Sequence, residues 1–543
     1  MNYPSLDKYL SQMEKCAKCG DCAYAVKLTT SRKPISMPCA VRNVLGFEAY
    51  DARGRIIVMK NLLQGKIEAD EKFLDWLYTC TTCANCKETC LAVPDGIDTP
   101  SMVEAMRKDA VAQGLTLDKH LTIKGFTQNQ HNPYGEPHSK RREFLRTEKL
   151  PSKGKVSYFV GCTTSYRQQD VARATVKLLK HAGVDFAMLG DEWCCGSVHL
   201  RLGYEELARE VMEHNLDEID RAGSETVVTT CSGCYRALKD AYRSLESSEG
   251  SRIKILHITE LLDQLAEKGK ISFSAKKLAR VTYHDPCHLG RHGGVYEAPR
   301  RLIERVKGAQ LVEMKTNRSY AHCCGAGGGV KSTHPNLATQ VARQRIGEAL
   351  EVNSDLLLTA CPFCKTNLSD ASNDLIRVQD VVEYLADSLS TAPGPNALPV
   401  QQLGASELGG ADFQAYLGRH PEIFVDLVKD SILDFAYFRS WNSFDKGEKP
   451  IDVFNVKRTE SGIEIKLGRA ERADVALNFS PDSVRDLVAS ANRDEYAKKF
   501  GRFYNEPTED KWIDFILNKS TKTLIRMGYG KFAREAGILQ EEE

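Results

Sequence analysis

The chain has 543 residues, enough for three or four domains that each bury an apolar core. Its 74 Lys and Arg residues balance 73 Asp and Glu residues, so charge does not indicate nucleic acid or an anionic surface as a partner. With no apparent secretory signal and no apolar run long enough to span a bilayer, we expect a cytoplasmic protein that reaches a membrane only through a partner. The 18 cysteines are unusual in so long a chain, and a metal-binding role explains them better than a small disulfide scaffold.

Eight cysteines in residues 1–118 have the spacing of ferredoxins. Three cysteines at two-residue gaps wrap one iron–sulfur cube, and in two-cluster ferredoxins the fourth ligand comes from the opposite group. The spacing predicts two cubane [4Fe-4S] clusters, one held by Cys16, Cys19, Cys22 and Cys90 and the other by Cys80, Cys83, Cys86 and Cys39. The proline that usually follows the last cysteine is replaced by Ala40 and Leu91. Paired zinc sites are the alternative, but they seldom use three cysteines in tandem.

Helical spacing of leucines and Phe73 predicts an α-helical ferredoxin-type domain over residues 1–118. Prolines and glycines then predict a connecting arm over residues 119–153 without a long element. His120, His131 and His138 are expected to be solvated in this arm, with a histidine metal site as the alternative.

An internal repeat fills residues 155 to about 390. Each half contains a single cysteine after a short strand, then a Cys-Cys-Gly triplet, then a Cys-x-x-Cys pair, at nearly the same intervals. The cysteines of the two halves are Cys162, Cys194, Cys195, Cys231 and Cys234, and Cys287, Cys323, Cys324, Cys361 and Cys364. We expect two duplicated domains, 154–275 and 276–392.

The same order of strands and helices is predicted in both halves. Buried strands are expected at 156–160, 226–230 and 253–257 in the first half, and at 281–283, 355–359 and 376–379 in the second, with helices between them. Alternating strands and helices form parallel sheets, whose ligands gather at the carboxyl ends of the strands. Because the cysteines follow those ends, the five thiols of each half should meet in one crevice.

These motifs resemble the catalytic subunit of heterodisulfide reductase, in the D-type form that fuses both parts in a single polypeptide, and its relatives in lactate and glycolate oxidation and in electron-transferring flavoprotein systems. The resemblance covers residues 1 to about 390. It implies a noncubane [4Fe-4S] cluster in each half, held by the five cysteines of that half, and a role in anaerobic metabolism. No nicotinamide or flavin fingerprint is evident, so a flavoprotein is expected to donate or accept the electrons.

Other interpretations of these motifs are weaker. The pairs Cys231/Cys234 and Cys361/Cys364 could be thioredoxin-like, but that assignment leaves the other six cysteines of the repeat without a role. The glycine run 325–329 lacks the Lys-Ser/Thr of a phosphate loop and fits a close backbone approach to a cluster. Four histidines near the cysteines could supply protons or bind sulfur: His199, His284, His288 and His322. His288, which directly follows Cys287, is the candidate catalytic residue.

The remainder of the chain contains no cysteine. A Pro/Gly/Ser-rich linker is predicted over residues 393–412 and a small α+β domain over 413–543, with strands at 451–456, 462–467 and 474–478. The order of elements is faintly similar to sterol-carrier-type domains. A docking module is the preferred role, and a pocket for a small apolar ligand is the alternative.

The whole chain is therefore predicted to be an α+β multidomain iron–sulfur oxidoreductase. Electrons would pass through the two cubane clusters to the two noncubane clusters, where a disulfide or thiol substrate is reduced or formed. The alternative is a non-catalytic relay between a flavoprotein, such as an electron-transferring flavoprotein or a hydroxyacid dehydrogenase, and a quinone-linked membrane partner.

Overall fold

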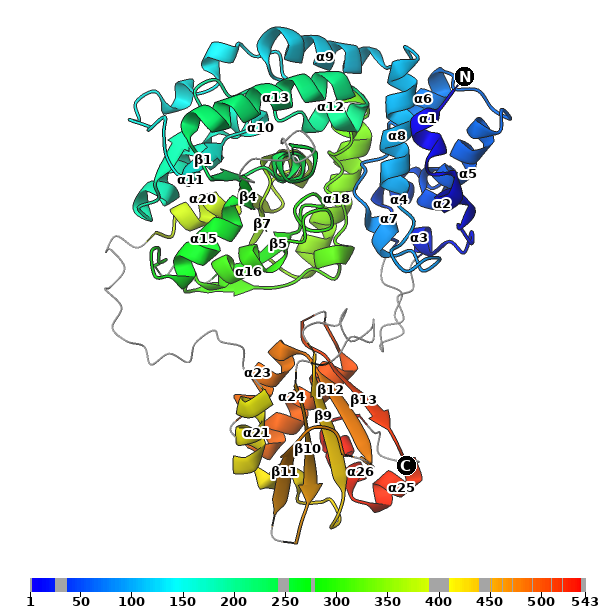
Figure 1. Cartoon of the computed structure of the whole chain (residues 1–543), viewed down its shortest axis with the longest axis vertical. Helices are drawn as coiled ribbons and strands as arrows, with labels where there is room; N and C mark the ends of the chain where they lie inside the picture. The colour runs from blue at the N-terminus through cyan, green and yellow to red at the C-terminus, as the bar shows by residue number, and fades with distance from the viewer. Residues whose placement is uncertain are drawn as a thin grey trace. The chain divides into compact units, whose positions relative to one another are not determined.

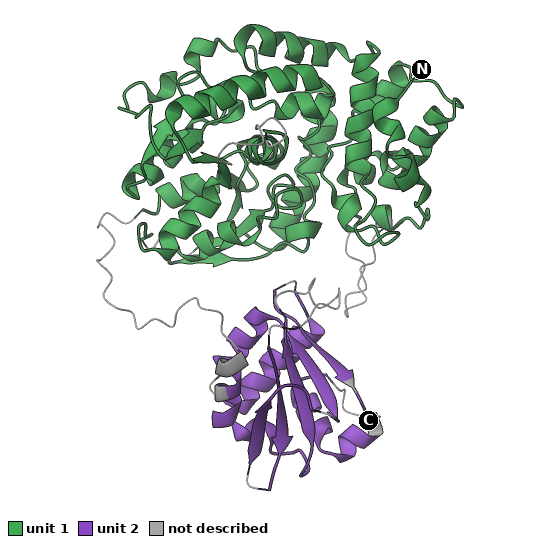
Figure 2. Cartoon of the chain, in the orientation of Figure 1, with its two compact units in different colours: residues 1–26, 34–397 green, residues 27–33, 398–543 purple. Residues whose placement is uncertain are grey.

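The computed structural model describes residues 2–24, 37–242, 253–274 and 279–389, and then 410–538 apart from 439–449 and residues 451, 461, 471, 491, 509 and 520. The described residues form two compact units, one within 2–389 and the other within 410–538 (Figure 2). The linker predicted over 393–412 lies almost wholly outside the described residues. Each unit is described by itself.

All regular structure within the described part of residues 2–153 is helical. The elements are α1 (Pro4–Asp7), α2 (Leu10–Glu14), α3 (Asp21–Tyr24), α4 (Ala40–Leu45), η1 (Glu48–Tyr50), α5 (Ala52–Leu63), α6 (Glu71–Leu77), α7 (Asn85–Glu88), α8 (Thr99–Ala112), α9 (Asp118–Gln130), η2 (His138–Lys140) and η3 (Glu143–Leu145) (Figure 1). Aspartates cap three of these helices, because the carboxylates of Asp51, Asp70 and Asp98 accept hydrogen bonds from backbone N–H groups of the first turn.

The arm predicted over 119–153 differs from the expectation. Helix α9 has 13 residues, and His120 on it is fully buried, with its ring against that of Tyr78 at a centroid distance of 4.3 Å. His131 stacks on Trp193 at 3.7 Å instead of standing free in solvent. The residues expected to break any long element, Pro133, Gly135, Pro137 and Pro151, all lie beyond α9. The arm therefore begins with a long helix, which packs on the duplicated region through Thr127 and His199.

Two four-stranded parallel sheets form the duplicated region and have the same strand order, β2-β1-β3-β4 and β6-β5-β7-β8. The strands are β1 (Val156–Phe159), β2 (Phe186–Met188), β3 (Thr226–Thr229) and β4 (Lys254–His257), and then β5 (Ala279–His284), β6 (Ala309–Leu311), β7 (Leu356–Thr359) and β8 (Arg377–Asp380). The predicted α/β alternation with parallel sheets is confirmed. The edge strands β2 and β6 were not predicted, because each has only three residues.

Helices follow the strands of each sheet in matching order (Figure 1). They are α10 (Cys162–Tyr166), α11 (Gln169–His181), α12 (Ser197–Leu202), α13 (Glu205–Ala222), α14 (Ser232–Arg236), η4 (Ala237–Ala241) and α15 (Ile258–Glu267), and then α16 (Glu297–Glu304), η6 (Arg318–Tyr320), α17 (Val330–Thr333), α18 (Pro335–Glu351), α19 (Pro362–Ser372) and α20 (Val381–Ala386). The last helix of each half starts with the same capping box, His257 with Glu260 and Asp380 with Glu383. One apolar core runs through both halves and includes Tyr158 and Tyr283.

The second unit is a five-stranded mixed sheet with order β11-β10-β9-β12-β13, in which only β9 and β12 are parallel. Its elements are α21 (Gly410–Arg419), η7 (Pro421–Phe424), β9 (Ile432–Tyr437), β10 (Asp452–Arg458), β11 (Ile463–Leu467), β12 (Val475–Phe479), α23 (Pro481–Val488), α24 (Arg493–Asn505), β13 (Ile513–Leu517), α25 (Thr521–Arg526) and α26 (Tyr529–Glu535). Strands β10, β11 and β12 lie where the sequence predicted them, whereas β9 and β13 were not predicted.

Candidate metal centres

The eight cysteines of the amino-terminal region line two neighbouring cavities. One cavity of about 430 Å³ is lined by Cys39, Cys80, Cys83 and Cys86. The other, of about 350 Å³, is lined by Cys16, Cys19, Cys22 and Cys90, with Cys86 between the two. The structure thus places Cys39 and Cys90 each with the opposite group, which is the arrangement that the cross-ligation prediction requires.

The two cysteine groups have the same backbone conformation. The residues on either side of the middle cysteine have positive φ in both: Lys18 and Gly20 around Cys19, and Thr82 and Ala84 around Cys83. Left-handed residues curl a short chain back on itself, so the three cysteines of each group turn toward one centre. Burial raises the pKa of Cys22 and of Cys39 to about 12, which makes an uncoordinated thiolate unfavourable at either position.

The five thiols of each half form one connected set with identical internal contacts. Contacts between neighbouring thiols shift pKa values in the same order in both halves. The pairs are Cys162 with Cys194, Cys194 with Cys195, Cys195 with Cys234 and Cys234 with Cys231, and in the second half Cys287 with Cys323, Cys323 with Cys324, Cys324 with Cys364 and Cys364 with Cys361. Each Cys-x-x-Cys pair is therefore part of a larger sulfur set. This arrangement argues against the thioredoxin-like interpretation.

The two sets meet at equivalent residues. A thiol contact joins Cys231 to Cys361, the first cysteines of the two Cys-x-x-Cys pairs. His288 lies at the same junction, close to both Gly233 and Cys231. A Cβ atom added to Gly233 would be 3.7 Å from the Cys231 sulfur and 3.8 Å from His288 Nδ1, so the glycine leaves space between the two side chains. Its Nε2 atom is 3.3 Å from an Arg236 guanidinium nitrogen. Burial and the charge of Arg236 hold the pKa of His288 well below its usual value.

The second half is in direct contact with the amino-terminal cysteines. The thiols of Cys83 and Cys323 are close enough that each shifts the pKa of the other. Arg291 bridges the same two segments, because its Nε donates to the Cys83 carbonyl at 2.6 Å and its guanidinium also donates to the Ala321 carbonyl at 2.7 Å. One cubane-type set and one five-thiol set therefore share a boundary.

Arg107 is fully buried at this boundary and binds four backbone carbonyl groups. Its guanidinium donates to the carbonyls of Leu77, Cys80, Arg201 and Gly328 at 2.8–2.9 Å. Gly328 has φ +62°, and a Cβ atom there would lie 2.4 Å from the Cys80 carbonyl oxygen. The glycine run thus allows a close backbone approach, as predicted, but the approach is to the cysteine loop of the amino-terminal region.

Among the described residues, no amino-terminal cysteine is a pKa-shifting neighbour of Cys162, Cys194 or Cys195 in the first half, although Arg107 binds the Arg201 carbonyl of that half. The arm covers the matching face: the Cys194 N–H donates to the His131 carbonyl at 2.9 Å, and the Tyr134 hydroxyl lies 2.9 Å from that of Thr163. Trp193, next to Cys194, is stacked between the rings of His131 and His214, both at 3.7 Å. The two halves therefore differ in what lies against their cysteine pairs.

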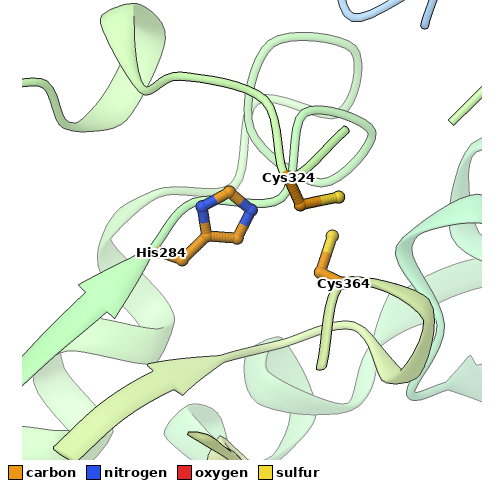
Figure 3. Close-up of side chains that lie close together, drawn as sticks. All are labelled: His284, Cys324 and Cys364. Carbon is orange, nitrogen blue, oxygen red and sulfur yellow. The ribbon is translucent and has the colours of Figure 1, made fainter. Parts of the chain in front are cut away.

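The remaining histidines near the cysteines have different environments. His284 is buried at the end of β5, with one ring nitrogen close to the sulfurs of Cys324 and Cys364 (Figure 3). His322 is hydrogen-bonded to Glu348. His199 faces the Thr127 hydroxyl at 2.9 Å, and burial lowers its pKa to about 3. Of these, only His284 is directed at sulfur, and sequence alone did not distinguish it from the others.

The donor chemistry of all four groups fits iron–sulfur clusters. The ligand atoms offered to each centre are thiol sulfurs, the usual ligands of such clusters, and three tandem cysteines on a curled loop suit a cube. Among the described residues, no Asp or Glu lines the cavity that contains Cys39. Asp21 is the only carboxylate among the described residues that line the cavity of Cys16, Cys19, Cys22 and Cys90.

The carboxyl-terminal unit contains an apolar pocket. Its lining is almost entirely aliphatic and aromatic and consists of Ile423, Phe424, Leu427, Leu433, Phe435, Val475, Leu477, Tyr496, Phe500, Phe515, Leu524, Ile525, Tyr529, Gly530, Phe532, Ala533 and Ile538. Ile525 is 44 % exposed and marks the side open to solvent. Of the two roles weighed for this region, the pocket favours the apolar ligand.

The comparison with protein families matches the repeat. A model described as a cysteine-rich domain matches residues 156–239 and again 281–369. Together with the relatives described next, this match makes the chain an iron–sulfur oxidoreductase with two cysteine-rich domains.

The chain belongs to the family of the heterodisulfide reductase D subunit. It is 36 % identical over 398 residues to the D subunit of the dihydromethanophenazine:CoB–CoM heterodisulfide reductase of Methanosarcina barkeri, an alignment that covers 70 % of this chain and 95 % of the relative. It is 28 % identical to the B subunit of the fumarate reductase (CoM/CoB) of Methanothermobacter marburgensis, over 69 % of this chain and 72 % of the relative. It is also 31 % identical to the EtfAB:quinone oxidoreductase of Syntrophomonas wolfei, over 57 % of this chain and 46 % of the relative.

No helix within the described ranges is both long enough and apolar enough to cross a membrane.

Proposed function

We propose that this chain is the electron-carrying subunit of a heterodisulfide reductase-like enzyme that reduces or forms a disulfide or thiol substrate. The observation that carries the proposal is the continuous series of sulfur contacts, from Cys83 to Cys323 and through the second set to Cys361 and Cys231. Electron transfer requires closely spaced centres, and this series joins the amino-terminal cysteines to both halves.

Four [4Fe-4S] clusters are proposed for this series. The residues that would hold the two cubane clusters are Cys16, Cys19, Cys22 and Cys90, and Cys80, Cys83, Cys86 and Cys39; those for the two noncubane clusters are Cys162, Cys194, Cys195, Cys231 and Cys234, and Cys287, Cys323, Cys324, Cys361 and Cys364. When bound, such clusters supply one-electron steps. Disulfide reduction takes two electrons and two protons for each sulfur–sulfur bond that breaks.

The chain's own residues would position the substrate and handle protons at the junction of the halves. His288 is the proposed proton-handling residue, because it follows Cys287 and lies beside Gly233 of the first half. Its low pKa leaves the ring neutral at neutral pH, so it is suited to exchange hydrogen bonds with a thiol rather than to hold a positive charge. Arg236 beside it carries a positive charge that would favour an anionic thiolate.

A flavoprotein is the proposed electron donor or acceptor, since the chain has no flavin or nicotinamide fingerprint. A quinone-linked membrane partner is the second candidate, in which this chain is a non-catalytic relay. The similarity to the EtfAB:quinone oxidoreductase supports that alternative. The protein is proposed to act on the cytoplasmic side, in contact with a membrane only through such a partner.

The carboxyl-terminal unit is proposed to bind an apolar ligand or the apolar part of a larger molecule. Seventeen residues line its pocket, and the polar side-chain atoms among them belong to two tyrosines. Burial of apolar surface would drive binding there.

Anaerobic purification with iron and sulfide analysis tests the four-cluster proposal. About sixteen irons per chain are expected, and far fewer in a folded anaerobic sample would contradict it. Electron paramagnetic resonance during titration with thiols separates the two functions. A signal that appears only with thiol supports catalysis, whereas fast oxidation by a flavoprotein without such a signal supports the relay.

A further inference from the structure

His284 stands at the end of β5, and its ring is 1 % exposed. Its Nδ1 accepts a hydrogen bond from the Arg345 Nε atom at 3.1 Å. Its Nε2 has no hydrogen-bond partner among the described residues, so it is a buried polar atom left unsatisfied. The group that faces sulfur is the far ring nitrogen, and it lies within 4.8 Å of the Cys324 and Cys364 sulfurs (Figure 3).

Arg345 determines which tautomer this imidazole adopts. A guanidinium only donates hydrogen bonds and stays protonated, so the Nδ1 atom that it contacts must present a lone pair. In a neutral imidazole the proton is then on Nε2, the atom that faces the two sulfurs. Arg345 is itself fully buried and held by the Thr316 carbonyl at 2.7 Å and by Glu348, so it has little freedom to turn away.

This arrangement is present in one half only. The position of His284, three residues before the first cysteine of its half, is occupied by Phe159 in the first half. Asn215 occupies the position of Arg345 in the first half. The two halves align here because the backbone of Ala208 lies against Gly196 as that of Ala338 lies against Gly325, and Asn215 and Arg345 each follow that alanine by seven residues. Asn215 donates to the Cys194 carbonyl at 3.0 Å and directs no group at sulfur.

We propose that His284 is a positioning residue that donates its Nε2–H to sulfur at Cys324 and Cys364, and that it raises the reduction potential of the second-half cluster above that of the first. The inference rests on the proposed clusters. A protonated nitrogen cannot bind iron, so His284 does not replace a cysteine. A donor to thiolate sulfur stabilises the state with more negative charge, which is the reduced state after it gains one electron.

The consequence is a redox order between the two halves. An electron that arrives from the Cys83 side would stay in the second half until a second electron or a substrate is present. No bond forms or breaks in this step.

Anaerobic redox titration of the full-length protein, followed by paramagnetic resonance, tests the inference. His284→Phe copies the first half and removes the donor. We expect the one-electron equilibrium constant of the second-half signal to fall about tenfold, which corresponds to about 59 mV. His284→Gln keeps a donor and is expected to stay within about threefold of wild type. Phe159→Leu is the matched control, and should leave the second-half signal unchanged.

A second measurement reads the bond itself. With ¹⁵N-labelled histidine, electron–nuclear double resonance should show a weakly coupled nitrogen and a proton that exchanges in D₂O. A strongly coupled nitrogen would make His284 an iron ligand and overturn the inference. So would an unchanged potential in a His284→Phe protein that keeps its iron. Wild-type protein without any second-half signal and with far fewer than about sixteen irons would instead overturn the four-cluster proposal on which this inference depends.

Discussion

The two halves of the duplicated region have the same strand order and the same contacts among their five thiols, but different segments of the chain lie against their cysteine pairs. The Cys323–Cys324 pair faces Cys83 and the amino-terminal helices, whereas the Cys194–Cys195 pair is covered by the arm and by Trp193. His284 and Arg345 add a buried hydrogen-bond pair to the second half alone. The difference teaches that duplication preserved the sulfur set while the neighbours of the two halves diverged. In the proposed electron path, the second half adjoins the amino-terminal clusters and the first half is reached through it.

Loss of a cysteine in one half should have the largest effect on this comparison. Cys323→Ser removes the thiol next to Cys83, so we expect loss of about four irons and no reduction of the first-half centre by a donor to the amino-terminal region. Iron analysis and paramagnetic resonance after a limiting reductant measure both. The matched Cys194→Ser should also lose about four irons but keep a reducible second half. Equal behaviour of the two variants would contradict the proposed order.

Removal of Arg107 should have the next largest effect. Arg107→Ala leaves four buried carbonyl groups at the boundary without a donor, so we expect the free energy of unfolding to fall by about 3–5 kcal/mol. Urea unfolding followed by circular dichroism measures the loss. Arg167→Ala on the first half, where the partner Glu136 is a third exposed, serves as the control and should cost less than about 1 kcal/mol. A small loss for Arg107→Ala would show that the boundary is held elsewhere.

Glu348→Gln should have an intermediate effect and tests the pH dependence of the second half. Burial alone would raise the pKa of Glu348, but the hydrogen bond from His322 and the charge of Arg345 bring it down to about 2. A carboxyl whose pKa is lowered by folding stabilises the protein above its ordinary pKa of 4.5, and this contribution is lost as the pH falls from there toward 2. We expect a loss of about 2 kcal/mol, equal at pH 7 and pH 5.

The matching substitution Glu218→Gln in the first half should cost less, because Arg221, its partner, is 67 % exposed. Urea midpoints of the two variants at both pH values give the comparison. If Glu218→Gln lowers the free energy of unfolding more than Glu348→Gln does, the stronger ion pair is in the first half and the prediction is wrong.

Trp193→Leu should have the smallest effect. It removes two ring contacts that hold the arm over the first half, with an expected loss of about 1 kcal/mol. Faster hydrogen exchange of the amides at 131–137 would report the loosened arm. His181→Ala, on the exposed end of α11, is the control and should leave that exchange unchanged. Unaltered exchange in Trp193→Leu would mean that the arm is held without the stack.

Much of the sulfur arrangement could be predicted from the sequence. The equivalent positions of Cys162 and Cys287 were predictable because a parallel sheet aligns the carboxyl ends of its strands. The grouping of Cys39 and Cys90 with the opposite cysteine group was predictable because two-cluster ferredoxins exchange their fourth ligands. The contact between Cys83 and Cys323 was not predictable, since it depends on how two separately folded segments dock. The burial of His120 was missed for the same reason: its partner Tyr78 belongs to another segment.

The asymmetry between the halves was visible in the sequence only as one substitution in an aligned repeat. Phe159 and His284 occupy the same position, but the significance of the histidine depends on Arg345, about sixty residues further along the chain. Strands β9 and β13 were missed because β9 is almost continuously buried and β13 has only five residues, so neither has a clear period of two.

The boundary between the amino-terminal helices and the second half is held by side chains that bind backbone atoms. Arg107, Arg291 and Asn85 all donate to carbonyl groups across it or beside it. A carbonyl group is present at every residue, so the segments that receive these bonds can change their side chains without losing the attachment. These bonds do not require the amino-terminal helices and the second half to belong to one chain. The same surfaces would hold them together equally well as two separate polypeptides.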